Sequence, residues 1–260
     1  MTSRSTCDTP VGLLPCAGHA RRLALTTGSK ELLRVPDVGG FGDVPVITYL
    51  LRQFRDAGVR EAVLARRGCK TDLAAHFAAT NSSDIDVHDL VVEPTAGSAH
   101  TLSLAASSVP DRTVVSGFPD IILTPPSIAR DALAQLAACE ADVCLAHIPI
   151  PAHERDVWDM STFEGARVVG ITMTPGEADY RVAWVLAVWR PSFTAYLAAW
   201  IAEHDASSRA AEGEVSLSDA LLGAIEAGLH VTSIVEPTGF GLDVGQPERL
   251  ASARALRPTR

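Results

Sequence analysis

The amino-acid sequence predicts an α/β fold, in which a mostly parallel mixed sheet is covered by helices on both faces. Short apolar runs alternate along the chain with segments of helical spacing, and the connections between them are short. This rhythm is typical of a parallel sheet with helices on both sides. A chain of 260 residues, of which 47% are hydrophobic and 20% charged, can bury a sizeable core. No stretch of linker composition divides it, so we predict a single domain over residues 1–260.

Strands and helices are expected to alternate up to residue 150. Val11–Cys16 is a short apolar run that enters a loop of small residues, which is typical of a buried strand. Val46–Ala57 has apolar residues at helical spacing and ends at Gly58, a common helix stop. The same criteria give, in order, strand Arg60–Ala65, helix Lys70–Ala78, strand Asp86–Val92, helix Ser98–Ser107, strand Thr113–Ser116, helix Ser127–Ala138 and strand Ala141–Ile150.

Residues 151–166 break this alternation, because they are polar and also contain Trp158 and Met160. We expect an inserted loop or hairpin there. Ser216 is a plausible N-cap for the helix that follows it. The remaining expected elements are strands Arg167–Met173 and Arg181–Trp189, helices Ser192–Glu203 and Leu217–Ala227, strand Leu229–Val235, a short strand or turn Gly239–Val244 and helix Pro247–Leu256.

Charge and composition exclude several classes of protein. The formal net charge is −9 and no long basic run is present, so nucleic acid is not an expected partner. No apolar run approaches the roughly 18 residues of a membrane span, and the first residues are polar, so we expect a cytoplasmic protein without membrane contact. The five cysteines are scattered without CxxC spacing, which favours reduced thiols over a disulfide or zinc framework.

A loop of small residues follows the first strand and is a candidate phosphate-binding loop. It consists of Cys16, Ala17, Gly18, His19, Ala20 and Arg21. Small residues allow backbone amides to approach a polyphosphate closely. Arg22 and Lys30 provide positive charge beside it. Neither the GxxxxGK[ST] spacing nor GxGxxG is present, which argues against a P-loop protein and a dinucleotide-binding enzyme; a purely structural strand–loop stays an alternative for this segment alone.

The whole segment VGLLPCAGHARRL…SKELLRV resembles the signature of the sugar-1-phosphate nucleotidyltransferases, the glucose-1-phosphate thymidylyl- and uridylyltransferases. Their pattern is an apolar strand, then (A/G)GxGTR, then KxLLPV. The resemblance covers most of the chain and implies a Rossmann-like fold of the nucleotide-diphospho-sugar transferase type. It implies that Gly18, Arg22 and Lys30 hold the triphosphate. The departures from the pattern are Ala17, Ala20, Arg21 and Arg34.

Two aspartates are candidate metal ligands. Asp120 follows an expected central strand, at the edge of the sheet where ligands bind in open α/β folds. A cap or turn role is the more common one for an isolated aspartate. However, Asp120 resembles the aspartate of the family's strand-GD motif, and the segment Gly239–Glu248 resembles its G-x-W-x-D-(I/V)-G-T-P-E motif. The resemblance therefore implies Mg²⁺ bound by Asp120 and Asp243, the type of ligand that Mg²⁺ prefers.

The segment from Glu93 to His100 resembles the base-reading part of these enzymes, with Glu93, Gly97 and Ser98 beside the base. The base stays open, with dTTP and UTP as the candidates. The sugar-binding Glu-Lys-Pro of the family is Met173-Thr174-Pro175 here, which removes a hydrogen-bonding carboxylate. A modified hexose, a heptose and a cyclitol phosphate are all open alternatives.

Two tryptophans of one expected strand, Trp184 and Trp189, lie five positions apart. Since side chains alternate along a strand, we expect them on opposite faces of the sheet. Trp189 is then a core residue, whereas Trp184, together with Thr174, is a candidate sugar-binding residue.

The resemblance implies an enzyme that transfers a nucleoside monophosphate from an NTP to a sugar phosphate and releases pyrophosphate. Arg22, Lys30 and Asp120 are the expected catalytic residues. No Ser/His/Asp nucleophile signature is present, and none is needed, because a phosphate attacks as the ionised group. The alternative is a nucleotide-binding paralogue with a regulatory or binding role, which the altered loop and the missing Glu-Lys-Pro suggest. A homo-oligomer is typical of the family and stays open.

Overall fold

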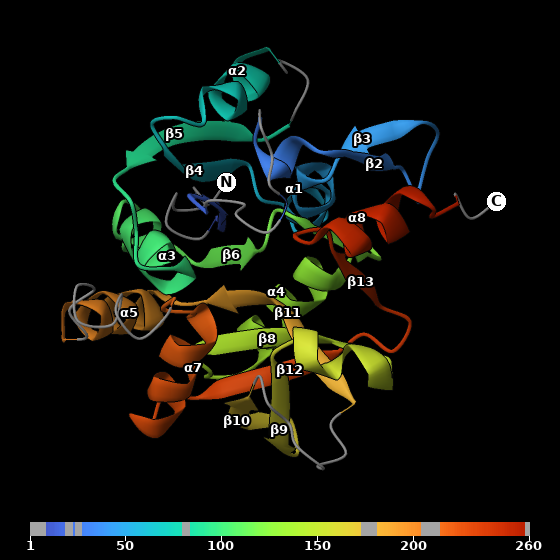
Figure 1. Cartoon of the computed structure of the whole chain (residues 1–260). Helices are drawn as coiled ribbons and strands as arrows, with labels where there is room; N and C mark the ends of the chain where they lie inside the picture. Colours follow the sequence, from blue (N-terminus) through green and yellow to red (C-terminus); the bar gives the residue numbers. More distant parts are fainter. Residues whose placement is uncertain are drawn as a thin grey trace, which may run out of the picture.

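A mixed nine-stranded sheet forms the centre of the computed structural model, within the part of the chain that it describes, residues 9–18, 23, 28–79, 84–172, 181–203 and 214–257. The strand order is β5-β4-β1-β6-β11-β8-β12-β10-β9 (Figure 1). All of these strands except β10 and β11 run in one direction, which confirms the mostly parallel mixed sheet. Their bounds are β1 Val11–Cys16, β4 Glu61–Arg67, β5 Asp86–Val92, β6 Val114–Gly117, β8 Val143–Pro149, β9 Met160–Glu164, β10 Arg167–Thr172, β11 Val182–Trp189 and β12 Val231–Val235.

Helices cover both faces of this sheet, as expected. One face carries α1 (Ile47–Asp56), α2 (Thr71–Ala79) and α4 (Ile128–Ala138); the other carries α3 (Ser98–Ser107), α5 (Pro191–Glu203) and α7 (Leu217–Glu226) (Figure 1). The strands have apolar residues on both sides for this reason. In β1, Leu14 packs into the first core, whereas Leu13 packs into the second.

A smaller layer lies at one end of the sheet, and only its last strand and its helix were expected from the sequence. It consists of the hairpin β2 (Arg34–Pro36) and β3 (Asp43–Pro45), the pair β7 (Ile121–Thr124) and β13 (Phe240–Asp243), and the helix α8 (Pro247–Arg254). β7 and β13 are antiparallel, and Asp243 is paired with Ile121. Asp120, which precedes β7, therefore lies beside Asp243 although the two are far apart in the chain.

Local features of the second half also agree with the sequence. The Ser216 hydroxyl accepts a hydrogen bond from Asp219 N at 3.2 Å, and the Asp219 carboxylate accepts one from Ser216 N at 2.9 Å, which completes a capping box at the start of α7. The segment expected as an insertion contains a 3-10 helix, Ala152–Val157, and then β9. Since β9 and β10 form an antiparallel hairpin, this segment extends the sheet at its edge.

The prediction that Trp184 and Trp189 face opposite sides of the sheet is wrong. β11 contains a register shift against β8 between Trp184 and Leu186. The extra residue reverses the alternation of side chains, and both indoles pack into the same core, with α5 and α7.

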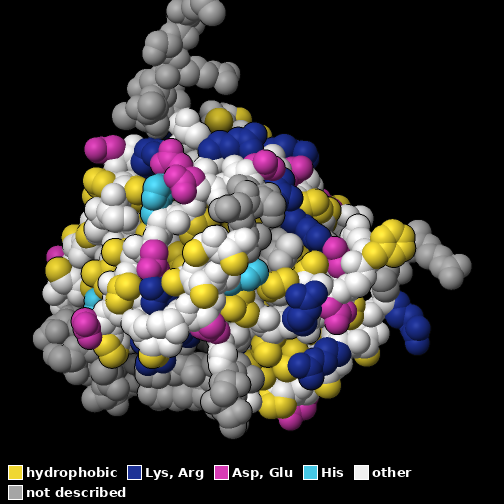
Figure 2. Space-filling view, turned by 90° about the horizontal axis from the view of Figure 1, so that it is seen from above, with side chains coloured by type: hydrophobic (Ala, Val, Ile, Leu, Met, Phe, Trp, Pro, Cys, Tyr) yellow, Lys and Arg dark blue, Asp and Glu magenta, His cyan; other side chains and the backbone are white. Residues whose placement is uncertain are grey.

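In the parts of the chain that are described, none of the helices combines the length and hydrophobicity needed to cross a membrane. Figure 2 shows the surface from above, where Lys and Arg side chains gather mainly in the right half of the view, with Asp and Glu side chains between them. Positive charge is therefore concentrated on one part of this face, although the net charge of the chain is −9.

Candidate active site

The first wall of the site is the end of β1. Cys16 is the last residue of this strand, Ala17 is buried and Gly18 is exposed. A Cβ atom on Gly18 would lie 3.9 Å from both Cε and Nζ of Lys30, so the lysine ammonium lies directly against the loop. Burial raises the pKa of the Cys16 thiol, and the nearby Glu31 carboxylate adds to this, so Cys16 stays a neutral packing residue.

Lys30 forms an ion pair with Asp120, with 2.5 Å between Lys30 Nζ and Asp120 Oδ2. Burial by itself lowers the pKa of a lysine, but here the Asp120 carboxylate outweighs it and the pKa of Lys30 is raised. Lys30 is therefore a fully charged ammonium, held where the small-residue loop and the acidic pair meet.

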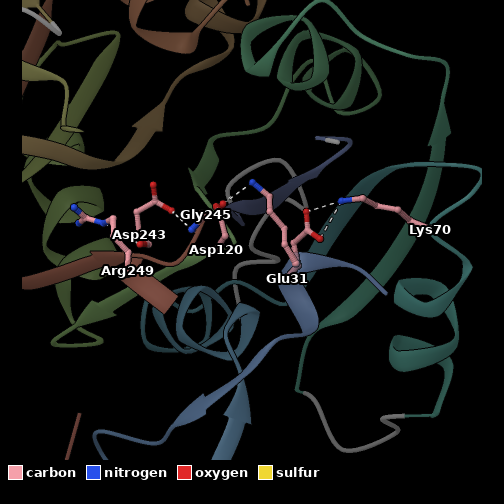
Figure 3. Close-up of polar contacts among 7 residues, drawn as sticks. Glu31, Lys70, Asp120, Asp243, Gly245 and Arg249 are labelled. Carbon is pink, nitrogen blue, oxygen red and sulfur yellow. Dashed lines mark hydrogen bonds and ion pairs between the residues drawn. The ribbon is translucent and has the colours of Figure 1, made fainter. Parts of the chain in front are cut away.

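Asp120 and Asp243 form that acidic pair. The backbone amide of Gly245 donates to Asp243 Oδ1 at 2.6 Å (Figure 3), and that of Val244 donates to the Asp120 carbonyl at 3.0 Å. A Cβ atom on Gly245 would lie 2.9 Å from Asp243 Oδ1 and 3.5 Å from Asp120 Oδ2, so both carboxylates border this glycine. Burial raises the pKa of Asp243, and the negative charge of Asp120 raises it further.

This pair fits a divalent cation that a substrate helps to bind. The described residues contain no group of three or more His, Cys, Asp or Glu side chains placed to hold a metal ion without other ligands. Mg²⁺ is usually bound by one or two carboxylates, with phosphate oxygens and water as the other ligands. Asp120 and Asp243 are adjacent, and the charge of Asp120 contributes to the raised pKa of Asp243, so a cation between them would relieve their repulsion. The two carboxylates are therefore suitable ligands for Mg²⁺.

Two contacts, which the sequence did not predict, clamp the backbone on either side of Lys30. Asp72 accepts hydrogen bonds from the Ser29 amide at 2.6 Å and from its hydroxyl at 2.8 Å. Lys70 donates to both oxygens of the Glu31 carboxylate, at 2.7 and 3.0 Å, and Glu31 is fully buried (Figure 3). Residues 29 and 31 are thus tied to residues 72 and 70 at the start of α2, while Lys30 extends toward Asp120.

Arg249 of α8 binds the backbone of Asp243 through its guanidinium group. Its Nε donates to the Asp243 carbonyl at 3.0 Å, and its Nη2 donates to Glu154 Oε2 at 2.9 Å. Its guanidinium also lies over the Trp158 ring, 5.7 Å from the ring centroid. The segment before β9 is therefore attached to the Asp243 turn, a link between distant parts of the chain for which the sequence carries no local signal.

The expected base-reading segment lies against the start of α7. The backbone comes so close here that a Cβ atom on Gly97 would lie 2.2 Å from the Val215 carbonyl oxygen. The Leu217 amide donates to Ser98 Oγ at 3.0 Å, and Glu93 is exposed. The close approach to Val215 accounts for glycine at position 97. Contacts of Glu93, Gly97 and Ser98 with a base stay predictions.

Trp184 is buried, with 3% of its surface exposed. Its indole N–H donates to Ser218 Oγ at 3.0 Å, and its ring lies 5.6 Å from that of Phe118. Its role in sugar binding stays a prediction. The other expected site residues, His19, Ala20, Arg21, Arg22 and Thr174, lie outside the described residues.

Solved structures with the same fold are known. A structure assigned as a glucose-1-phosphate thymidylyltransferase of Bacillus anthracis, in complex with sucrose, has a TM-score of 0.74 and 17% identity over 97% of each chain. A UDP-glucose pyrophosphorylase of Acinetobacter has a TM-score of 0.75 and 18% identity over 95% of this chain and 92% of its own. A UDP-glucose pyrophosphorylase complexed with UDP-glucose has a TM-score of 0.73 and 17% identity over 95% of this chain and 97% of its own.

Sequence comparison adds no further relatives: no protein-family model matches the chain, and a search of curated protein sequences gives no significant match. The structural likeness extends over nearly the whole length of both chains in each comparison, at an identity where fold is conserved and function varies. This chain therefore has the fold of the glucose-1-phosphate thymidylyltransferase and UDP-glucose pyrophosphorylase structures.

Proposed function

We propose that this protein transfers a nucleoside monophosphate from a nucleoside triphosphate to a sugar 1-phosphate or a similar phosphate, which gives a nucleoside diphosphate sugar and pyrophosphate. The observation that carries the proposal is the convergence of Lys30, Asp120 and Asp243 at one edge of the sheet. These residues come from three distant segments and meet beside Gly18 of the small-residue loop. The shared fold supports the same class of reaction.

The reaction needs positioning and charge more than proton transfer. A phosphate oxygen of the acceptor attacks the α-phosphorus of the triphosphate, and a new P–O bond forms. The bond from the α-phosphorus to its bridging oxygen breaks, and pyrophosphate leaves with that electron pair. A phosphate monoester has a second pKa of about 6 and is already ionised at neutral pH, so no general base is required.

The residues present have suitable roles for this step. Lys30 lies between Gly18 and Asp120, where its ammonium can neutralise a triphosphate that approaches the loop. Asp120 and Asp243 would hold Mg²⁺, which when bound neutralises phosphate charge and fixes the α-phosphate in line with the attacking oxygen. Arg249 and the Gly245 amide keep the Asp243 turn in place.

Among triphosphates, dTTP and UTP are the leading candidates, in keeping with the thymidylyltransferase and the UTP-bound UDP-glucose pyrophosphorylase that share the fold. The sugar is expected to differ from glucose, since Met173-Thr174-Pro175 lacks the carboxylate of the Glu-Lys-Pro motif.

A pyrophosphate-release assay tests the proposal. The protein is incubated with Mg²⁺, each nucleoside triphosphate or deoxynucleoside triphosphate in turn, and a panel of hexose, heptose and cyclitol phosphates. We expect pyrophosphate to be released only when one particular triphosphate and one particular acceptor are both present. Mass spectrometry should then detect a nucleoside diphosphate sugar as the second product. Triphosphate binding without release for any acceptor would instead favour a nucleotide-binding paralogue.

A further inference from the structure

A carboxylate oxygen without a partner lies near the proposed active site. Asp159 immediately precedes β9, and its Oδ2 accepts a hydrogen bond from the Ser218 hydroxyl. Its Oδ1 is buried and has no hydrogen-bond partner, and no other carboxylate oxygen in the described residues is in this position. A buried acceptor without a donor costs free energy, so its presence calls for an explanation.

One set of contacts joins Asp159, through Trp184 of β11, to the segment between β6 and Asp120. The Trp184 amide donates to the Asp159 carbonyl at 3.2 Å, and the Trp184 indole donates to Ser218 Oγ, which in turn donates to Asp159. The Trp184 ring packs against Phe118, two residues before Asp120. A chain of contacts through Ser218, Trp184 and Phe118 thus connects Asp159 with the segment that precedes Asp120.

A second set of contacts connects the same residue to Asp243. Trp158, the neighbour of Asp159, donates from its indole to Glu154 Oε2 at 3.2 Å. Glu154 also accepts from Arg249, which donates to the Asp243 carbonyl. The two aspartates of the acidic pair are therefore linked to the Asp159 segment by independent routes, which fixes its position relative to both.

We propose that Asp159 binds a hydroxyl group of the phosphorylated polyhydroxyl acceptor, with Oδ1 as the hydrogen-bonding atom. This rests on the proposed function, because it assigns the acceptor side of the same site. Asp159 as a residue is only partly buried, so part of it is accessible from outside the core. Burial raises the pKa of Asp159, and a hydroxyl suits either protonation state because it both donates and accepts.

The test compares Asp159→Ala and Asp159→Asn with the wild-type protein, using the acceptor that gives the fastest pyrophosphate release and its monodeoxy analogues. We expect Asp159→Ala to raise the KM for the acceptor by about 10-fold or more, which corresponds to the loss of one buried hydrogen bond, and to leave the KM for the triphosphate unchanged. One deoxy analogue should lose affinity for the wild type but not for Asp159→Ala. Asp159→Asn, which keeps the size and one acceptor oxygen, should lie between the two.

Asp142→Asn is the matched control. Asp142 also accepts from a serine hydroxyl, Ser192 Oγ at 2.6 Å, but it lies at the amino end of β8, whereas Asp120 follows the carboxyl end of β6, so its replacement should leave both KM values unchanged. Wild-type KM values for acceptor and triphosphate in Asp159→Ala would overturn the assignment of Asp159 and leave the proposed function intact. No release by the wild type with any substrate pair would contradict the proposed function, and the assignment would fall with it.

Discussion

The chain contains only two lysines, Lys30 and Lys70, and both form ion pairs beside the candidate site, Lys30 with Asp120 and Lys70 with Glu31. Everywhere else its positive side chains are arginines. A lysine ammonium is compact and donates in any direction, whereas an arginine guanidinium is a wide planar fork. A compact group suits the close contacts of both lysines, Lys30 with Gly18 and Lys70 with the Glu31 carboxylate.

Replacement of Lys30 tests this at the level of a single residue. Lys30→Gln should lower kcat for pyrophosphate release by about 100-fold or more, because one preorganised charge is lost from the site. Lys30→Arg should restore little of it, since the larger group does not fit between the loop and Asp120. Steady-state kinetics with both variants provide the measurement, and activity close to wild type in Lys30→Gln would contradict the role given to this ammonium.

His147 makes stability depend on pH. It is fully buried, its Nε2 lies 2.9 Å from Ser161 Oγ, and burial lowers its pKa to about 4. Below the ordinary histidine pKa of about 6.5 the unfolded chain takes up a proton that the folded protein does not. The contribution of neutral His147 to stability is therefore complete above that pH and is lost as the pH falls toward 4.

Urea unfolding measures this effect. Between pH 7.5 and pH 5 we expect His147 to account for about 2 kcal/mol of lost unfolding free energy. Asparagine does not titrate, so His147→Asn should lose about 2 kcal/mol less unfolding free energy than the wild type over this pH range. The same change at the exposed His153 is the control and should leave the wild-type pH dependence unchanged. An equal pH dependence of the unfolding free energy in the wild type and in His147→Asn would show that His147 does not cause the loss of stability at low pH.

The sequence predicted Lys30, Asp120 and Asp243 as site residues, because each stands in a recognisable motif, and the structure brings them together. The sequence did not identify Glu31, Lys70, Asp72 or Arg249, whose partners lie far away in the chain. The Ser29–Asp72 and Glu31–Lys70 contacts, for example, span 43 and 39 residues. A single charged residue within a helix start or a turn carries no sign of such a partner.

Among the elements, the short 3-10 helix Lys30–Leu32 is held in position by another element. Both of its anchors, Asp72 and Lys70, come from the start of α2. The Glu31–Lys70 ion pair is buried, and buried ion pairs stabilise little more than well-packed apolar residues do. We infer that its effect is to orient Lys30.

A comparison of single and double variants distinguishes orientation from stability. Lys70→Met alone should lower the unfolding free energy by about 3–5 kcal/mol, because Glu31 is left buried without a partner. The double variant Glu31→Met, Lys70→Met should recover much of this stability but remain low in kcat. The pair Arg66–Asp89, with 2.6 Å between Arg66 Nη2 and Asp89 Oδ2 on adjacent strands, is the control, since its loss should leave kcat unchanged. A double variant with wild-type kcat would exclude the orienting role.

Other features of the elements follow from pairing rather than from local pattern. The bulge in β11 arises from its register with β8, so two tryptophans that alternation places on opposite faces share one core. β7 is a short apolar segment that was not expected as a strand, because its identity depends on β13, more than a hundred residues later. This pairing brings the two aspartates together.

For the whole molecule, the sequence predicted the sheet and its two layers of helices well, because buried strands and amphipathic helices have strong periodic patterns. The strand order follows from tertiary pairing and could not be obtained from the chain alone, except through the family resemblance. The single domain over residues 1–260 stays a prediction. The site lies where the carboxyl ends of the parallel strands β1 and β6 meet the smaller layer, the usual position of a ligand in an open α/β sheet.

The most direct test of the account is the Mg²⁺ dependence of pyrophosphate release in the wild type, Asp120→Asn, Asp243→Asn and the control Asp142→Asn. We predict that release by the wild type and Asp142→Asn rises with Mg²⁺ to the same plateau and is absent with excess EDTA. Asp120→Asn and Asp243→Asn should lose about 100-fold or more in rate at saturating Mg²⁺, since each removes a charged ligand. Release by either variant at the wild-type rate and Mg²⁺ dependence would contradict the assignment of the two aspartates as the metal-binding centre of a nucleotidyltransferase.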